Sequence, residues 1–169
     1  MKLRVLTTTL ALLSAGLAHG VLAAGIADNI AAVGPFIRLV PPGASATAAY
    51  LVLKNNGDRD ARLVRASTPA ARVAELHEHV DEHGVMKMRK VDAIEIKAHG
   101  NTVLQPGGLH LMLIDPAPMQ EGDKVAITLG FDDGSSKQID VPVLRPAPAS
   151  MSMPAGPAAA PMDHPAHQH

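Results

Sequence analysis

The chain has 169 residues, enough for one domain with appendages rather than for two full domains. Its formal net charge of -1 gives no overall positive charge, so nucleic acid is not expected as a partner. Cysteine is absent, which excludes disulfides, thiolate metal sites, thiol redox chemistry and cysteine nucleophiles. Two phenylalanines and one tyrosine are the only aromatic residues, so Val, Leu, Ile and Ala must build the core. Eight methionines and nine histidines stand out against this background.

Residues 1–23 are typical of a signal peptide. Lys2 and Arg4 give a positive start, an apolar stretch occupies residues 5–18, and small residues favour cleavage after Ala23. The stretch is too short to favour a permanent anchor, although an uncleaved anchor is the alternative. We therefore expect export to the periplasm, with no membrane insertion after cleavage.

Between residues 30 and 144, short apolar segments alternate with turns rich in Pro, Gly, Asn and Asp. The expected strands are 36–40, 49–55, 61–67, 73–79, 85–91, 93–96, 102–104, 109–114, 125–131 and 138–144. Many short strands at close spacing predict an all-β domain, a sandwich or barrel, over 30–144. No segment has a sustained helical period, although 67–73 could form one turn of helix.

The composition changes at residue 145, after which Pro and Ala dominate. Such a segment cannot bury enough apolar surface to fold, so we expect 145–169 to be disordered. Its candidate metal ligands are Met151, Met153, Met162, His164, His167 and His169. Histidines in succession suit Cu(II) and methionines suit Cu(I), so this segment could accept either ion.

The expected strand 109–114 carries a possible pair of metal ligands. Alternate residues of a strand face opposite sides, so Leu109, Leu111 and Leu113 would face the core. His110 and Met112 would then share the other face. Taken alone, such a pair is more often incidental than functional.

A second group of histidine and methionine residues precedes this strand. His77 and His79 share one face of an expected strand, and Met86 and Met88 share one face of the next. A hairpin through 81–84 would bring the two pairs close together. The alternative is that both methionines pack in the core while both histidines are solvated.

A mixed set of imidazoles and thioethers selects among metals. Thioether sulfur is soft and uncharged, and with imidazole it suits copper, particularly Cu(I). Zinc prefers Cys, His or carboxylate, whereas calcium and magnesium prefer oxygen. Neutral ligands leave Cu(I) with its positive charge, which limits affinity and permits transfer to a partner.

The spacing of four residues, His77, Met88, His110 and Met112, resembles that of the PCu(A)C family of periplasmic copper chaperones. The sequences at 48–51, 73–77, 84–89 and 106–112 agree with the same family, as do Asn55 and Gly57. The resemblance covers nearly all of residues 35–144.

The resemblance implies a cupredoxin-like Greek-key β-sandwich that carries Cu(I) towards the copper sites of respiratory oxidases. The ligands that it implies are His77, Met88, His110 and Met112. Met86 could substitute for Met88, and His79 is an additional candidate that the family pattern does not require. The expected partner is a copper-accepting assembly factor or an oxidase subunit, and the protein is expected to be a monomer.

Three other functions are alternatives to a copper chaperone. A blue-copper electron carrier needs a Cys thiolate, which this chain lacks. A periplasmic copper scavenger or storage protein for copper tolerance would use mainly the segment 145–169. A structural sandwich domain that binds a protein or sugar would leave the Met and His residues incidental. No catalytic constellation stands out, so an enzyme is not expected.

Overall fold

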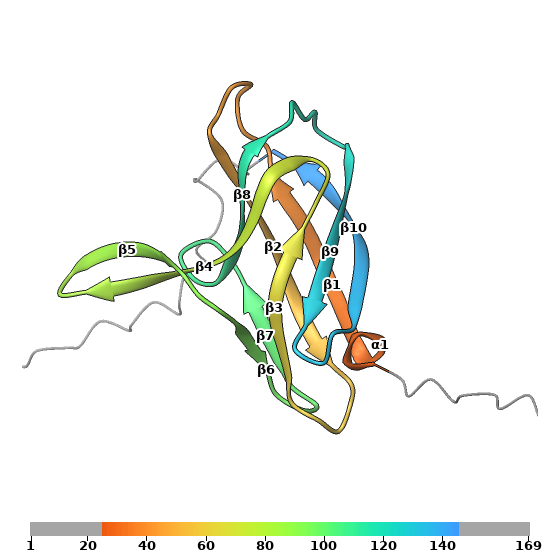
Figure 1. Ribbon diagram of the computed structural model, residues 1–169. Coiled ribbons are helices and arrows are strands. Elements are labelled where there is room, and N and C mark those ends of the chain that lie inside the picture. The colour runs from red at the N-terminus through yellow and green to blue at the C-terminus, as the bar shows by residue number, and fades with distance from the viewer. Residues whose placement is uncertain (1–24, 146–169) are drawn as a thin grey trace, which may run out of the picture.

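The computed structural model describes residues 25–145, and this part of the chain is built almost entirely of strands (Figure 1). In chain order its elements are α1 (Ile26–Asn29), β1 (Ile30–Arg38), β2 (Ala46–Asn55), β3 (Ala61–Ser67), β4 (Ala71–Glu82), β5 (Val85–Lys90), β6 (Ile94–Ile96), β7 (Asn101–Leu104), β8 (His110–Pro116), β9 (Lys124–Phe131) and β10 (Ser136–Leu144). None of the helices within 25–145 has the length and hydropathy needed to cross a bilayer. The predicted signal peptide and the six candidate ligands beyond residue 145 lie outside the described residues.

The strands follow one hydrogen-bonded path, β5-β4-β8-β2-β1-β10-β9-β3-β6, and β7 pairs with β2. The pairing of β1 with β10 is parallel and joins two groups of antiparallel strands. The path folds over itself into two layers, with β5, β4, β8, β2 and β1 in one and β10, β9, β3 and β6 in the other (Figure 1). This is the β-sandwich that the sequence predicts.

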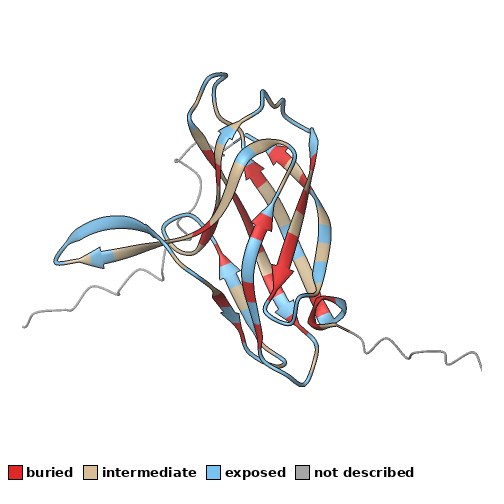
Figure 2. Ribbon diagram, viewed as in Figure 1, coloured by how far each residue is buried: buried red, intermediate tan, exposed pale blue. Residues whose placement is uncertain are grey.

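The core lies between these two layers and follows from alternation along each strand. Leu53 of β2 and Leu111 of β8 are fully buried in one layer, and Leu63 of β3 and Ile127 of β9 are fully buried in the other. All four belong to one contiguous apolar cluster. Figure 2 shows the buried residues concentrated along the strands of the sandwich body. Aliphatic side chains thus supply nearly all of the core, as the composition requires.

All ten expected strands are present, although some boundaries differ. Strand β1 begins at Ile30 rather than at residue 36, and β4 extends to Glu82. The expected turn of helix at 67–73 is wrong, because Pro69 and Ala70 form a tight turn and β4 begins at Ala71. The Thr68 hydroxyl accepts the Ala70 N–H at 3.2 Å, which closes this turn locally.

Strands β4 and β5 form a hairpin that projects from the sandwich body (Figure 1). Glu82 pairs with Val85, so His83 and Gly84 alone make the turn. Their φ values are 58° and 81°, as a type I′ turn requires. Every residue of β5 is exposed, as Figure 2 shows. The hairpin therefore adds little to the core and presents its side chains to solvent.

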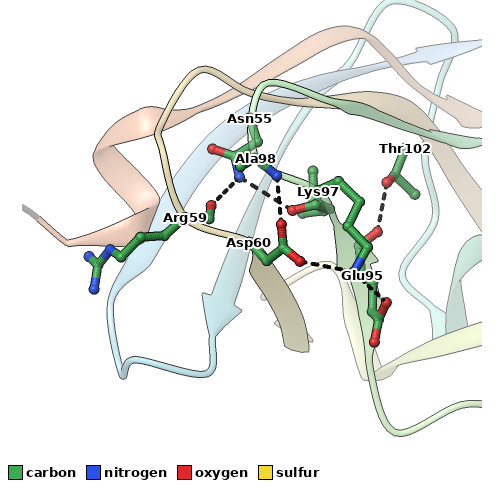
Figure 3. A network of polar contacts seen from close by, with 8 residues as sticks. Asn55, Arg59, Asp60, Glu95, Lys97, Ala98 and Thr102 are labelled. Carbon is green, nitrogen blue, oxygen red and sulfur yellow. Dashed lines mark hydrogen bonds and ion pairs between the residues drawn. The ribbon is translucent and has the colours of Figure 1, made fainter.

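A polar network fastens the loop after β2 to the segment after β6 (Figure 3). The Asp60 carboxylate accepts the Ala98 N–H at 2.8 Å and the Lys97 ammonium at 2.9 Å. The Asn55 amide donates to the carbonyl oxygens of Arg59 at 2.7 Å and Ile96 at 3.3 Å. Backbone groups that would otherwise lack partners in these loops are satisfied by the two side chains.

Candidate metal centre

Strands β4 and β8 place three of the four predicted ligands together. His77 of β4 is paired directly with His110 of β8, and their ring centroids are 5.8 Å apart. Met112 lies two residues along β8 on the same face, opposite Glu75. Leu111, between the two predicted ligands, points into the core and is fully buried.

The fourth predicted ligand, Met88, lies on the same face but one step farther out. It is paired with His79 of β4, two residues beyond His77. Same-face neighbours along a strand are separated by two rises of about 3.3 Å. Met86 follows after another such step, opposite Asp81. We call this row the His/Met ladder; its members are Met112, His110, His77, His79, Met88 and Met86.

The two methionines of β5 are exposed rather than packed in the core. The exposed fraction is 47% for Met88 and 56% for Met86. The alternative in which they pack in the core is therefore wrong. His77 and His79 are half-buried, so the same alternative also fails to describe the histidines as solvated.

His110 lies opposite the leucine face, as predicted, and yet it is only 2% exposed. The His79 ring stacks on it with centroids 5.1 Å apart and planes at 28°. Tyr50 approaches from β2 with ring centroids at 6.3 Å, and Phe36 packs against Tyr50. His110 is consequently covered by rings.

The turn before β8 fixes the proton on His110. Nδ1 of His110 lies 3.0 Å from the Gly108 carbonyl oxygen, which can only accept, so Nδ1 carries the hydrogen. Burial lowers the pKa of His110, an effect opposed by the Gly108 hydrogen bond and reinforced by the nearby His79 and His77. The ring is neutral at pH 7, and its Nε2 holds a free lone pair.

Glu75 fixes the proton on His77 in the same way. Its carboxylate lies 2.9 Å from His77 Nε2 and 2.9 Å from the Lys90 ammonium. The hydrogen bond from His77, followed by that from Lys90, lowers the pKa of Glu75, so the carboxylate is ionised and only accepts. Nε2 therefore carries a hydrogen, and in the neutral ring the lone pair is on Nδ1.

Two ring nitrogens of the ladder are buried without a hydrogen-bond partner in the described part of the chain. They are Nδ1 of His77 and Nδ1 of His79. A buried polar atom without a partner is costly, so each nitrogen is suited to an ion that the protein acquires. Histidines that bind metals typically donate the other ring N–H to a carboxylate or a carbonyl, as His77 and His110 do here.

Glu75 and Gly108 are functional candidates that sequence reasoning missed. Glu75 stands two residues before His77, and the alternation of a strand places it on the ligand face. Within residues 25–145, no group of three or more His, Cys, Asp or Glu side chains is placed to hold a metal ion.

Comparison with known proteins gives a family match over residues 30–143, to the family described as LpqE-like. A protein of Leifsonia xyli subsp. xyli that carries the name of a lipoprotein, Lxx21020, is 39% identical over 103 residues. That match covers 60% of this chain and 62% of the relative. Protein RP573 of Rickettsia prowazekii is 35% identical and matches over 59% of its length. The chain thus spans about three fifths of the curated relatives it matches.

Solved structures with the same fold include DR1885 from Deinococcus radiodurans. Its apo form is 30% identical, with a TM-score of 0.56, covering 86% of this chain and 97% of that chain. Its Cu(I) form is 35% identical, with a TM-score of 0.56, and the match covers 66% of this chain and 75% of that chain. The copper-bound PCuAC domain from PmoF2 is 24% identical with a TM-score of 0.59, covering 70% and 94%, and at that identity it shows the fold alone. The cupredoxin-like fold expected from the sequence is confirmed.

Proposed function

The chain belongs to the LpqE-like family, which is the PCuAC family of copper-binding domains, and we propose that it is a periplasmic copper chaperone. In this proposal the folded domain binds one Cu(I) ion and delivers it to the copper sites of respiratory oxidases. The proposed ligands are His77, Met88, His110 and Met112. Recipients would be an assembly factor or an oxidase subunit, and the protein would act as a monomer without catalysing a reaction.

The observation that carries the proposal is the pairing of two pre-oriented imidazoles beside thioethers. His77 and His110 each have one ring nitrogen held by an acceptor and the other free. Met112 shares their face on β8, and Met88 lies on β5 opposite His79, one step farther along the same face. Soft sulfur combined with neutral nitrogen suits Cu(I) better than zinc, calcium or magnesium.

The donor set also supports transfer rather than permanent retention. All four proposed ligands are uncharged, so they do not neutralise the ion as thiolates would. A chain without cysteine therefore binds Cu(I) without the strongest soft ligand that proteins offer. The exposure of Met88 gives a recipient access to one ligand of the bound ion.

A copper scavenger or storage protein is the second candidate function. It is favoured by the sequence of residues 145–169, where six Met and His residues occur among Pro and Ala. A scavenger would keep its copper in the presence of a recipient, whereas a chaperone would release it. Incubation of the copper-loaded protein with an apo-oxidase copper domain separates the two.

The ligand set is tested on a full-length chain without the candidate Met and His ligands beyond residue 145. In this chain the three methionines are replaced by leucine and the three histidines by asparagine. We call it the segment-substituted chain. Anaerobic titration with Cu(I) against a coloured chelator should show one equivalent bound, and X-ray absorption should show mixed nitrogen and sulfur neighbours. His110→Ala and Met112→Leu should each weaken this binding and leave the fold intact. A shell of nitrogen alone would contradict the proposal.

A further inference from the structure

The ladder continues past the proposed copper site, onto residues that the site does not use. His79 and Met86 lie on the ligand face of the hairpin, beyond His77 and on either side of Met88. We propose that His79 and Met86 form, together with Met88, an outer copper position through which Cu(I) enters and leaves the inner one. This inference rests on the proposed function and adds a route to it.

The register of the hairpin places these three side chains next to one another. His79 is directly opposite Met88, and Met86 is the next same-face residue on β5. Directly opposed residues have Cβ atoms about 5 Å apart, within reach of a shared ion. Nδ1 of His79 is buried and has no hydrogen-bond partner among the described residues, as expected for a nitrogen kept for a ligand.

Exposure differs sharply between two members of the ladder. His110, one of the proposed inner ligands, is 2% exposed, whereas Met86, the outermost member, is 56% exposed. A protein recipient cannot reach a buried imidazole without rearrangement of the rings above it, but it can contact Met86 directly. His79 and Met88 lie between His110 and Met86, so they can carry the ion from the exposed residue to the buried one.

The other face of the hairpin has a different chemistry. Lys87 forms an ion pair with Glu82 at 2.7 Å, and Arg89 approaches Glu78 at 3.6 Å. By alternation these charged residues point away from the ladder. The ligand face between His77 and the turn keeps only one charged side chain, Asp81, which accepts the Gly84 N–H at 2.6 Å. The hairpin thus separates its charged pairs from its soft ligands.

The transfer step is a ligand exchange without electron or proton transfer. Met88 stays bound while the bonds from copper to His77, His110 and Met112 break. New bonds form to His79 Nδ1 and to the Met86 sulfur, and the ion remains Cu(I) throughout. Each ligand is neutral before and after the step, so charge is conserved.

Kinetics on the segment-substituted chain tests the outer position. Cu(I) is loaded anaerobically, and release to bathocuproine disulfonate is followed by stopped flow. His79→Phe keeps a flat ring over His110 but removes the nitrogen, and Met86→Leu conserves volume at an exposed site. Both variants should release copper about tenfold more slowly. Equilibrium affinity should be unchanged, so loading should slow by the same factor.

Three further variants separate copper ligation from other effects of substitution. His79→Met supplies a soft ligand at the same position and should restore the rate. His83→Asn removes a hairpin histidine from the turn, outside the ladder, and should release copper at the wild-type rate. Met88→Leu, in contrast, should lower the affinity itself, because Met88 belongs to both positions.

The outcomes distinguish the outer position from the inner site. Wild-type release rates in both His79→Phe and Met86→Leu would overturn the outer position while leaving the proposed function intact. A large loss of equilibrium affinity in both would also overturn it, because they would then be ligands of the inner site. A parent chain that binds no Cu(I) would overturn the proposed function as well.

Discussion

Glu75 is not a proposed copper ligand, but its hydrogen bond holds the ring of His77, which is one. Its carboxylate accepts the His77 Nε2 hydrogen at 2.9 Å, and this contact leaves the lone pair of the neutral ring on Nδ1. Lys90 holds the second carboxylate oxygen at 2.9 Å, so the group has little freedom to turn away. Partners of this kind orient metal-binding histidines and raise their basicity.

We expect Glu75→Ala to lower the Cu(I) affinity of the segment-substituted chain by about tenfold, a typical cost of losing such a partner. The His77 ring would then be free to rotate and to carry its hydrogen on either nitrogen. Anaerobic chelator competition measures the effect. Glu78→Ala is the matched control, because Glu78 lies on the same strand and faces the opposite side. Equal affinities in the two variants would contradict the role of Glu75.

At this scale the strand face of the proposed ligands was easier to predict than their surroundings. Alternation along a strand correctly placed His110 and Met112 on the face opposite Leu111. The burial of His110 could not be predicted, because it results from rings on β2 and β4 that the local pattern does not relate to β8. The order of pairing between strands is set by the whole sandwich rather than by any one segment.

At the scale of elements, the two strands of the β4–β5 hairpin carry four of the six ladder residues, and His79, Met88 and Met86 lie beyond the pairing of β4 with β8. Its two-residue turn depends on Gly84, whose φ of 81° is in the left-handed region. A Cβ at this position would meet nothing within 4 Å, so the backbone conformation alone is costly for another residue. The turn sets the register that places Met88 opposite His79.

Gly84→Ala should therefore weaken Cu(I) binding by straining the hairpin by about 1 kcal/mol. Global stability should change little, because β5 contributes no buried residue. Gly134→Ala is the matched control, since Gly134 has a φ of 83° and equally open surroundings in the turn between β9 and β10. It should lower the urea midpoint and leave copper affinity unchanged. The reverse pattern would show that the hairpin does not position Met88.

Strand existence could be predicted from the sequence more reliably than strand length. Apolar segments between Gly and Pro turns identified all ten strands. The early start of β1 was missed because Gly34 and Pro35 interrupt its pattern, at a register irregularity between Val33 and Phe36. The tight turn before β4 was mistaken for helix because a Ser/Thr-Pro-Ala sequence allows either structure.

At the scale of the molecule, the ion pair of Asp60 and Lys97 joins two loops at the edge of the sandwich (Figure 3). The Ala98 N–H, followed by Lys97, lowers the pKa of Asp60 from 3.8. Because the folded-state pKa lies below the unfolded one, the carboxylate stabilises the fold above pH 3.8. That contribution is lost as the pH falls through the folded-state pKa.

Asp60→Ala should lower the urea midpoint at neutral pH, and the deficit relative to the parent should shrink as the pH falls below 3.8. Urea titrations followed by circular dichroism at several pH values measure this. Asp140→Ala, which removes an exposed carboxylate on β10, is the control and should show a smaller deficit at neutral pH. If the difference in urea midpoint between Asp60→Ala and the parent stays constant below pH 3.8, ionised Asp60 does not stabilise the fold.

The segment 145–169 would extend copper capture beyond the sandwich. Its six Met and His residues, set among Pro and Ala, supply thioether and imidazole ligands. A tethered ligand set raises the effective copper concentration near the folded site. Its imidazoles must be neutral to bind, so capture should weaken as the pH falls through about 6.5, the reference pKa of histidine.

Truncation after Leu144 should accordingly abolish most Cu(II) binding, slow the loading of copper, and leave the Cu(I) affinity of the folded site largely unchanged. Each proposed Cu(I) ligand lies between residues 77 and 112, so the deletion removes none of them. Isothermal titration with Cu(II), together with chelator competition for Cu(I), compares the truncated and full-length chains. A truncated chain that binds Cu(II) as well as the full one would place the Cu(II) site within the sandwich. His77 and His79 would then be its first candidates, since both have a buried Nδ1 without a partner.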